Sequence, residues 1–195
     1  NLLIKGNFDN DMNALQEEFA TIVSQLSMDE CAFVKRALLK NILQLCVFYG
    51  RKKTNDYVLP LIITFLNFQR EWRLKHALFE QIVGISVFVG PTSLKEFILP
   101  CIVQALYDAE EFVVEQALNA LVCLTELSMF KKPKLIEIAK KVAPLLQHPN
   151  TWLRYDAVGF FAAASKQLGV VDTSCFLLEI LKPHLAYQIL LVSEY

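Results

Sequence analysis

The fold is decided by Trp152-Leu153-Arg154-Tyr155-Asp156-Ala157-Val158, the last of four copies of one pattern. The earlier copies are Phe33-Val34-Lys35-Arg36-Ala37-Leu38, Trp72-Arg73-Leu74-Lys75-His76-Ala77-Leu78 and Phe112-Val113-Val114-Glu115-Gln116-Ala117-Leu118. Their alanines recur every forty residues. Apolar residues follow at helical spacing, for example at Leu78, Ile82, Ile85 and Val89, or at Leu118, Leu121, Leu124 and Leu127. This spacing predicts a buried amphipathic helix in each copy.

A second apolar segment precedes each copy, so the chain divides into helix–turn–helix units. These segments lie at 19–26, 59–66, 99–106 and 142–146. Asp29, Asp108 and Asn150 are predicted to cap helices or form the turns within units. Between units, three glycines are predicted to be left-handed C-caps: Gly50, Gly90 and Gly169.

A period of about forty residues is typical of HEAT and armadillo repeats. We therefore predict an all-α fold, a right-handed α-solenoid of HEAT-type helical hairpins with four repeats plus the first helix of a fifth. The predicted bounds are 11–50, 56–90, 93–130 and 134–169, with a partial repeat at 173–195. No low-complexity linker interrupts the array, so 1–195 is predicted to be a single domain. Because it starts at Asn1 in mid-pattern, we expect a fragment of a longer protein.

Composition excludes several classes of protein. The hydrophobic share of 54% and charged share of 20% exclude intrinsic disorder. No stretch approaches the roughly 18 apolar residues of a spanning helix, and 19 basic against 20 acidic residues argue against nucleic-acid binding. The runs 51–53 and 131–134 are too short to change this and are expected in solvated loops. The five cysteines lie in apolar segments, which predicts small core residues in a reducing compartment.

The sequence offers little for catalysis. Its three histidines, His76, His148 and His184, have no second histidine or cysteine at metal-ligand spacing. No nucleotide-binding, hydrolase or metalloprotease motif occurs, so we expect no metal, no cofactor and no catalytic residues. The acidic turn at 108–111 is better explained by carboxylates at a helix N-terminus than by a catalytic pair.

Three further features suggest contacts between repeats or with partners. The aromatic column Trp72, Phe112 and Trp152 is explained better by packing between repeats than by a peptide-binding ladder. Asp108 and Arg154 are predicted to form a structural ladder contact. Exposed positions before the alanines are predicted to line up as a partner-binding row: Arg73, Lys75, His76, Glu115, Gln116, Tyr155 and Asp156.

Several stretches resemble one family. They are Glu71-Trp72-Arg73-Leu74, Ile82-Val83-Gly84, Tyr107-Asp108-Ala109-Glu110-Glu111-Phe112-Val113, Ala117-Leu118-Asn119-Ala120-Leu121 and His148-Pro149-Asn150-Thr151-Trp152-Leu153-Arg154-Tyr155-Asp156-Ala157-Val158-Gly159-Phe160. They are similar to the HEAT-repeat region of the regulatory subunit of the class III phosphatidylinositol 3-kinase. Val34, Leu74 and Val114 depart from the regular HEAT pattern, in which an arginine is common at this position.

The resemblance implies a subunit with a protein-kinase-like domain, a HEAT solenoid and a WD-repeat propeller. It implies that this segment is a non-catalytic scaffold that assembles with the lipid-kinase catalytic subunit and a beclin-type subunit. The implied location is cytoplasmic, peripheral on endosomal and autophagic membranes. Two alternatives stay open: a HEAT adaptor that binds a peptide or cargo, such as a transport factor, and an enzyme, which requires a polar pocket that the sequence does not indicate.

Overall fold

The computed structural model describes residues 2–68 and 71–185, and the side chains from residue 11 onward within those ranges. All regular structure in these ranges is helical, which confirms the all-α prediction. The chain divides into two compact units, 1–90 and 91–195, each described by itself below. The single domain over 1–195 stays a prediction.

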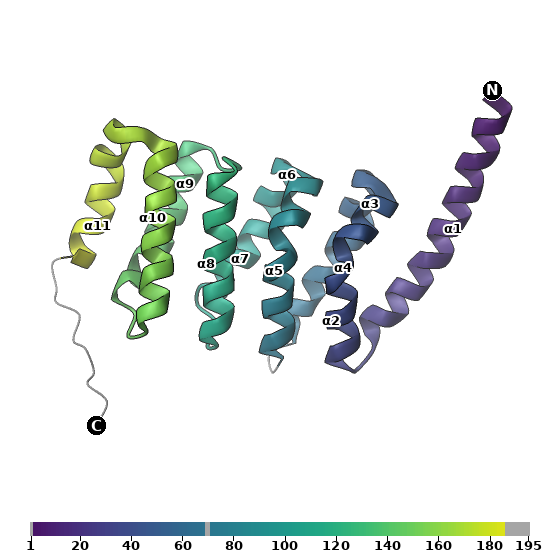
Figure 1. Ribbon diagram of the computed structural model, residues 1–195, viewed down its shortest axis with the longest axis horizontal. Helices are drawn as coiled ribbons and strands as arrows, with labels where there is room; N and C mark the ends of the chain where they lie inside the picture. The colour runs from purple at the N-terminus through teal and green to yellow at the C-terminus, as the bar shows by residue number, and fades with distance from the viewer. Residues whose placement is uncertain (1, 69–70, 186–195) are drawn as a thin grey trace. The chain divides into compact units, whose positions relative to one another are not determined.

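Unit 1 contains two helical hairpins (Figure 1). Helix α1 (Leu2–Met28) is followed by α2 (Ala32–Lys40) and α3 (Ile42–Lys53), then by a wide π-type turn (Thr54–Val58) and α4 (Leu59–Ile63). A short 3-10 turn (Thr64–Asn67) leads toward α5 (Trp72–Val89). The predicted stripe of α5 is confirmed, because Leu78, Ile82, Ile85 and Val89 are all buried.

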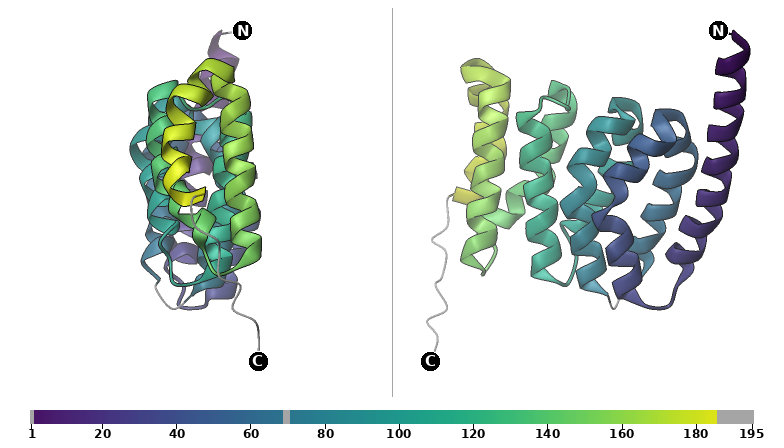
Figure 2. Two further views of the ribbon diagram at one scale, coloured as in Figure 1. Left: turned by 90° about the vertical axis from the view of Figure 1, so that its left-hand side faces the viewer. Right: turned by 45° about the vertical axis from the view of Figure 1, so that its right-hand side comes forward.

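Unit 2 continues the same alternation. It contains α6 (Pro91–Ser93), a π-type turn (Leu94–Ile98), α7 (Leu99–Ala105), α8 (Glu111–Glu126), α9 (Lys132–Val142) and a 3-10 turn (Ala143–Gln147). Helix α10 (Thr151–Asp172), a third π-type turn (Thr173–Leu177) and α11 (Leu178–Leu185) complete it. Helices α8 and α10 lie side by side, with α7 and α9 in a second layer (Figures 1 and 2).

The core of unit 2 lies between these two layers. Leu118, Leu121 and Leu124 of α8 are buried as predicted. Leu127 is 53% exposed, because α8 ends at Glu126 and the stripe ends with it. On α10, Leu153 and Phe160 are fully buried.

Each of the three glycines predicted between units interrupts the helix for a single residue. Gly50, Gly90 and Gly169 have φ of 74°, 94° and 81°, and ψ of 165°, 176° and 173°. This is not the left-handed helical conformation that we predicted but the extended conformation at positive φ, which is essentially restricted to glycine. One such residue redirects the chain, so the helix resumes at the next residue.

A hydroxyl supports two of these junctions. Thr54 Oγ1 donates to the Cys46 carbonyl at 3.2 Å, and Thr173 Oγ1 donates to the Ser165 carbonyl at 3.4 Å. Both bonds cross a glycine and span eight residues, so each hydroxyl ties the chain after the glycine to the last turn of the helix before it. The π-type turns at Leu94–Ile98 and elsewhere begin four residues after the glycine, so the junction geometry itself repeats.

The turns within hairpins are closed by side chains two residues before the helix cap. Asp29 Oδ1 accepts from the Cys31 amide at 2.7 Å, and Asp108 Oδ1 accepts from the Glu110 amide at 3.1 Å. Both aspartates are therefore turn formers, as expected of Asx turns, and not helix caps. Asn150 is the N-cap residue of α10, but its side chain makes no cap hydrogen bond.

Two composition-based predictions were wrong. Of the five cysteines, only Cys46 is buried; Cys101 is half-buried, and Cys31, Cys123 and Cys175 are exposed. The run at 51–53 is not a solvated loop but part of α3, because the chain stays helical after Gly50. Lys53 Nζ donates to Gln16 Oε1 of α1 at 2.7 Å, so the run links neighbouring hairpins.

Candidate functional site

The predicted partner-binding row lies on α5, α8 and α10, where the second helix of each hairpin begins. In unit 1, Arg73 is exposed with its guanidinium 4.8 Å from the Trp72 ring, while Lys75 and His76 are half-buried. In unit 2, the members are Glu115, Gln116, Tyr155 and Asp156. The alignment of the unit 1 residues with those of unit 2 stays a prediction.

Within unit 2, the row brings two acidic residues of neighbouring hairpins together. Asp156 Oδ2 is buried without a hydrogen-bond partner. Burial and, second, the negative charge of Glu115 on α8 raise the pKa of Asp156 above its ordinary value. Holding these two carboxylates close together in a partly buried place therefore costs free energy whenever both are ionised.

Exposed aromatic side chains flank this acidic pair. Tyr155 is 73% exposed, and the rings of Phe112 and Trp152 lie 5.1 Å apart between α8 and α10. Phe112 and Trp152 therefore pack between neighbouring repeats, but they are 42% and 38% exposed and are not core residues. The place of Trp72 in the column stays a prediction. Partly exposed tyrosine and tryptophan are enriched among the residues that contribute most to protein–protein binding.

Arg154 fixes the turn that leads into α10. Its Nη1 donates to the carbonyls of His148 and Pro149, both at 2.8 Å, and its Nη2 donates to Thr151 Oγ1 at 3.0 Å. The contact between Asp108 and Arg154 stays a prediction.

The sequence analysis missed a polar link between the third and fourth hairpins. Asn150 Nδ2 donates to Glu111 Oε2 at 2.5 Å, and His148 Nε2 lies 4.0 Å from Glu111 Oε1. His148 Nδ1 accepts from the Asn150 amide at 3.1 Å, so His148 closes a turn in the way that Asp108 does. The forty-residue register places 108 and 148 in equivalent turns and is the signal that could have found this link.

The sequence analysis also missed Lys35, which occupies the position of Lys75 one repeat earlier. Its side chain is only 2% exposed, and its Nζ lies 3.5 Å from the ring centre of Phe68 and 6.0 Å from that of Phe65. A desolvated cation over an aromatic face is attracted by the ring quadrupole. Lys35 therefore stabilises the first hairpin junction and is not a docking residue.

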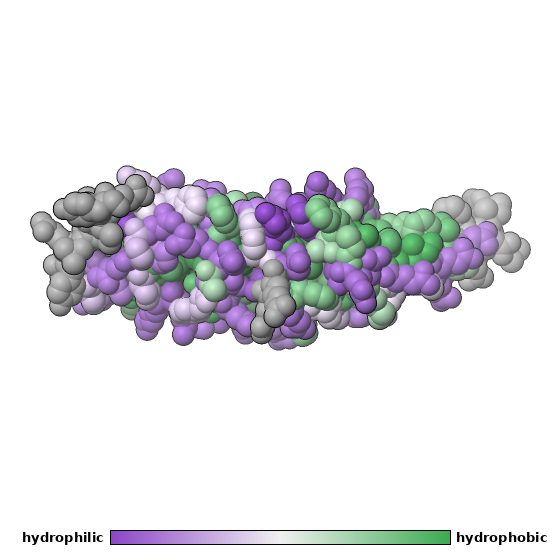
Figure 3. All heavy atoms as spheres, turned by 90° about the horizontal axis from the view of Figure 1, so that it is seen from below, coloured by the Kyte–Doolittle hydropathy of each residue, from purple (hydrophilic) through white to green (hydrophobic). Residues whose placement is uncertain are grey.

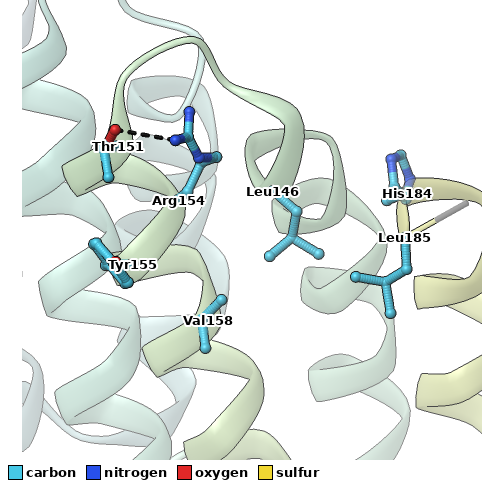
Figure 4. A pocket seen from close by; sticks show the side chains of 7 residues that line it. All are labelled: Leu146, Thr151, Arg154, Tyr155, Val158, His184 and Leu185. Atoms are coloured by element: carbon cyan, nitrogen blue, oxygen red, sulfur yellow. Dashed lines mark hydrogen bonds between the residues drawn. The ribbon is translucent and has the colours of Figure 1, made fainter. Parts of the chain in front are cut away.

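A pocket of about 430 Å³ lies beside the row in unit 2, between the 3-10 turn, α10 and α11 (Figure 4). Its lining residues are Leu146, Thr151, Arg154, Tyr155, Val158, His184 and Leu185. Arg154 is bonded to Thr151 in the wall, and the rest of the lining is mainly apolar. Such a lining provides packing surface and no nucleophile paired with a base.

An apolar stripe on α1 lies in unit 1. Leu15, Phe19, Ile22 and Leu26 follow one another at helical spacing and are 39–49% exposed. Figure 3 shows apolar side chains gathered over this part of unit 1, next to the grey N-terminal residues.

Neither a metal centre nor a membrane span is present in the described part of the chain. No group of three or more histidine, cysteine, aspartate or glutamate side chains there has the arrangement of a metal site. None of the described helices combines the length and apolarity that crossing a membrane requires.

Comparison with known proteins identifies the family. A family model described as "PIK3R4-like, middle domain" matches residues 3–195. The chain belongs to this PIK3R4-like family. The match confirms the regulatory-subunit family to which the stretch at 148–160 is similar, and it is to the middle helical domain, not to the kinase domain.

Curated relatives agree with this assignment. The chain is 45% identical over 179 residues to a probable serine/threonine-protein kinase vps15 of Dictyostelium discoideum. It is 41% identical over 186 residues to the serine/threonine-protein kinase VPS15 of Arabidopsis thaliana, and 44% over 161 residues to that of Saccharomyces cerevisiae. These alignments cover 91%, 94% and 83% of this chain but only 9%, 12% and 11% of the relatives.

Proposed function

We propose that this chain is a non-catalytic scaffold segment that mediates assembly of a class III phosphatidylinositol 3-kinase complex. The observation that carries the proposal is the match of residues 3–195 to the middle domain of the PIK3R4-like family. The proposed partners are the lipid-kinase catalytic subunit and a beclin-type subunit. The proposed setting is cytoplasmic, peripheral on endosomal and autophagic membranes, in trafficking and autophagy.

We further propose that the hairpins form a right-handed HEAT solenoid with four repeats and the first helix of a fifth. The recurring glycine junctions support this, because Gly50 and Gly90 are followed by the same π-type turn at the same spacing. Repeated junctions impose the same step between successive hairpins. Within unit 2, the second helices α8 and α10 then present adjoining surfaces to partners.

The docking surface that we propose is the row on α5, α8 and α10. Its support in unit 2 is the exposed Tyr155 and the half-exposed Trp152. Large aromatic side chains with a polar end bury much area at little entropic cost when a partner covers them.

The experiment is capture of purified subunits by the immobilised chain. The chain is offered a recombinant class III catalytic subunit and a beclin-type subunit, singly and together, and we expect the strongest retention when both are present. The variant Lys75→Glu with Glu115→Lys tests the row. The control, Lys52→Glu with Glu126→Lys, changes the same charges at two exposed positions outside it.

We expect the row variant to lose capture and the control to keep it. Equal capture by both variants would refute the row as the docking surface but would leave the proposed scaffold role standing. Failure of the unmodified chain to retain either subunit under any combination would refute the scaffold role itself.

A further inference from the structure

The junction between α8 and α9 departs from the other three. It has no glycine: α8 ends in a Schellman turn, in which the Ser128 amide donates to the Thr125 carbonyl at 2.8 Å and the Met129 amide to the Leu124 carbonyl at 3.0 Å. Ser128 has φ of 55° and is the non-glycine residue with positive φ in the described part of the chain. The chain leaves helical structure until α9 begins at Lys132.

A pocket of about 410 Å³ opens at this irregular junction, entirely within unit 2. Its walls come from residues 91–99 on one side and 129–137 on the other. Leu94, Leu99 and Phe130 are buried and line its floor, with the half-buried Met129 beside them. A floor of this kind accepts a large apolar side chain.

The rim of this pocket is basic. Lys95, Lys131 and Lys134 line it, and Glu137 is the one carboxylate among the lining residues. Lys134 Nζ lies 2.8 Å from Glu137 Oε2, so these two charges offset each other. Lys95 and Lys131 are exposed, and neither forms an ion pair with any side chain described at 11–68 or 71–185.

The remaining lysine of this run is held elsewhere. Lys132 Nζ lies 2.6 Å from Asp172 Oδ1 and 5.1 Å from the ring centre of Phe176. The run at 131–134 was expected in a solvated loop, but its three lysines have different roles. Lys132 holds α9 through Asp172, Lys134 pairs with Glu137, and Lys131 remains exposed at the pocket. Two unpaired positive charges beside an apolar floor attract a ligand that is both acidic and apolar.

We propose that this pocket binds a linear peptide segment of a partner protein. The segment inserts one large apolar side chain against Leu94 and Phe130 and sets acidic residues against Lys95 and Lys131. A peptide fits better than a membrane surface, because membrane binding uses projecting apolar side chains and these are recessed. This proposal rests on the proposed scaffold role in one respect: a partner protein must supply the peptide segment.

The test measures binding of a defined probe to the whole chain in the absence of any subunit. The probe is a fluorescein-labelled heptapeptide with phenylalanine at its centre and three aspartates on each side, followed by fluorescence anisotropy. The variant Lys95→Glu with Lys131→Glu is expected to weaken binding about tenfold or more. The control, Lys140→Glu with Lys141→Glu, has the same net charge change at exposed positions of α9 outside the pocket and is expected to bind as the unmodified chain does.

The apolar floor is tested by changing the probe, which avoids a folding defect in the protein. A peptide with serine in place of phenylalanine is expected to bind about tenfold more weakly or worse, since the loss of one large buried side chain is worth this much. Equal binding of the two peptides, or equal losses in both lysine variants, would overturn the proposal and leave only general charge attraction.

A further arm replaces the peptide with vesicles of phosphatidylcholine and phosphatidylserine. Vesicle binding that depends on Lys95 and Lys131, without peptide binding, would also overturn the proposal. Because no kinase subunit is present in any arm, a negative result here is distinct from failure of the capture experiment.

Discussion

Replacing Gly90 with alanine tests whether the hairpin junctions depend on a backbone conformation restricted to glycine. Gly90 has φ of 94° and ψ of 176°, and a side chain there costs about 1–3 kcal/mol of strain. An added Cβ would also lie 1.8 Å from Arg51 Nη2. The guanidinium must then move, and it loses the 3.0 Å hydrogen bond that Arg51 Nε donates to the Val89 carbonyl.

Gly50 separates the two contributions. Its φ of 74° and ψ of 165° are similar, but an added Cβ would have no neighbour within 4 Å. Gly50→Ala therefore costs the strain alone, about 1–3 kcal/mol. Gly90→Ala adds the loss of a part-buried hydrogen bond, about 0.5–1.5 kcal/mol, for a total of about 1.5–4.5 kcal/mol.

The assay is urea unfolding of the unmodified chain, Gly50→Ala, Gly90→Ala, Arg51→Ala and the double variant of Arg51 and Gly90. In the Arg51→Ala background, Gly90→Ala should cost the same as Gly50→Ala, because the clash is gone and only strain is left. A free energy of unfolding unchanged by Gly50→Ala would refute the strain argument. A Gly90→Ala cost that is the same with and without Arg51 would refute the clash.

The other predictions concern single sites in both units. Gly159→Ala should raise the free energy of unfolding by about 0.5–1 kcal/mol, because alanine favours the helix and an added Cβ in α10 has no neighbour within 4 Å. Gly84→Ala has the same helix propensity gain, but its Cβ would lie 2.8 Å from Leu43 Cδ1. Because Leu43 is exposed and its methyl groups can move aside, we expect the gain in the same urea titration to be smaller than that of Gly159→Ala but not reversed. Asp156→Asn should raise the melting temperature at pH 7 and not at pH 3, as followed by circular dichroism. Because the pKa of Asp156 is raised in the folded chain, the ionised carboxylate destabilises the fold. This loss of stability is absent at pH values below the pKa of Asp156 in the unfolded chain and complete above its pKa in the folded chain. An equal melting shift at both pH values would contradict this.

The helices were predictable from sequence because the spacing of buried residues reflects the helix period directly. The stripe Leu78, Ile82, Ile85 and Val89 needs no knowledge of its neighbours to be recognised. The junctions were less predictable. A glycine after an apolar stripe signals positive φ, but ψ distinguishes a C-cap that ends a helix from a one-residue kink, and nothing at Gly90 in the sequence encodes ψ.

The site residues were less predictable because their roles depend on how neighbouring hairpins are rotated. Lys35 and Lys75 occupy the same register, yet Lys35 is buried over Phe68 while Lys75 is half-buried. From sequence alone, a lysine is expected to point into solvent. The contact of Lys35 with the ring of Phe68 can be recognised only once the fold places the two residues together. The same holds for the link from Glu111 to Asn150, which joins residues of two hairpins.

Ser128, at the junction between α8 and α9, allows the stability of the chain and its binding of a peptide to be tested separately. Ser128 adopts the left-handed helical conformation, which costs a residue with a side chain about 1–2 kcal/mol. Strained backbone persists where the surrounding structure determines it, and Ser128 directly precedes Met129, one of the residues that line the pocket. Glycine adopts the same φ without strain, at a cost of about 0.4–1 kcal/mol through the unfolded chain. Ser128→Gly should therefore raise the free energy of unfolding by about 0.5 kcal/mol and leave binding of the acidic phenylalanine peptide unchanged. Weaker peptide binding by this variant would mean that the serine side chain itself belongs to the site.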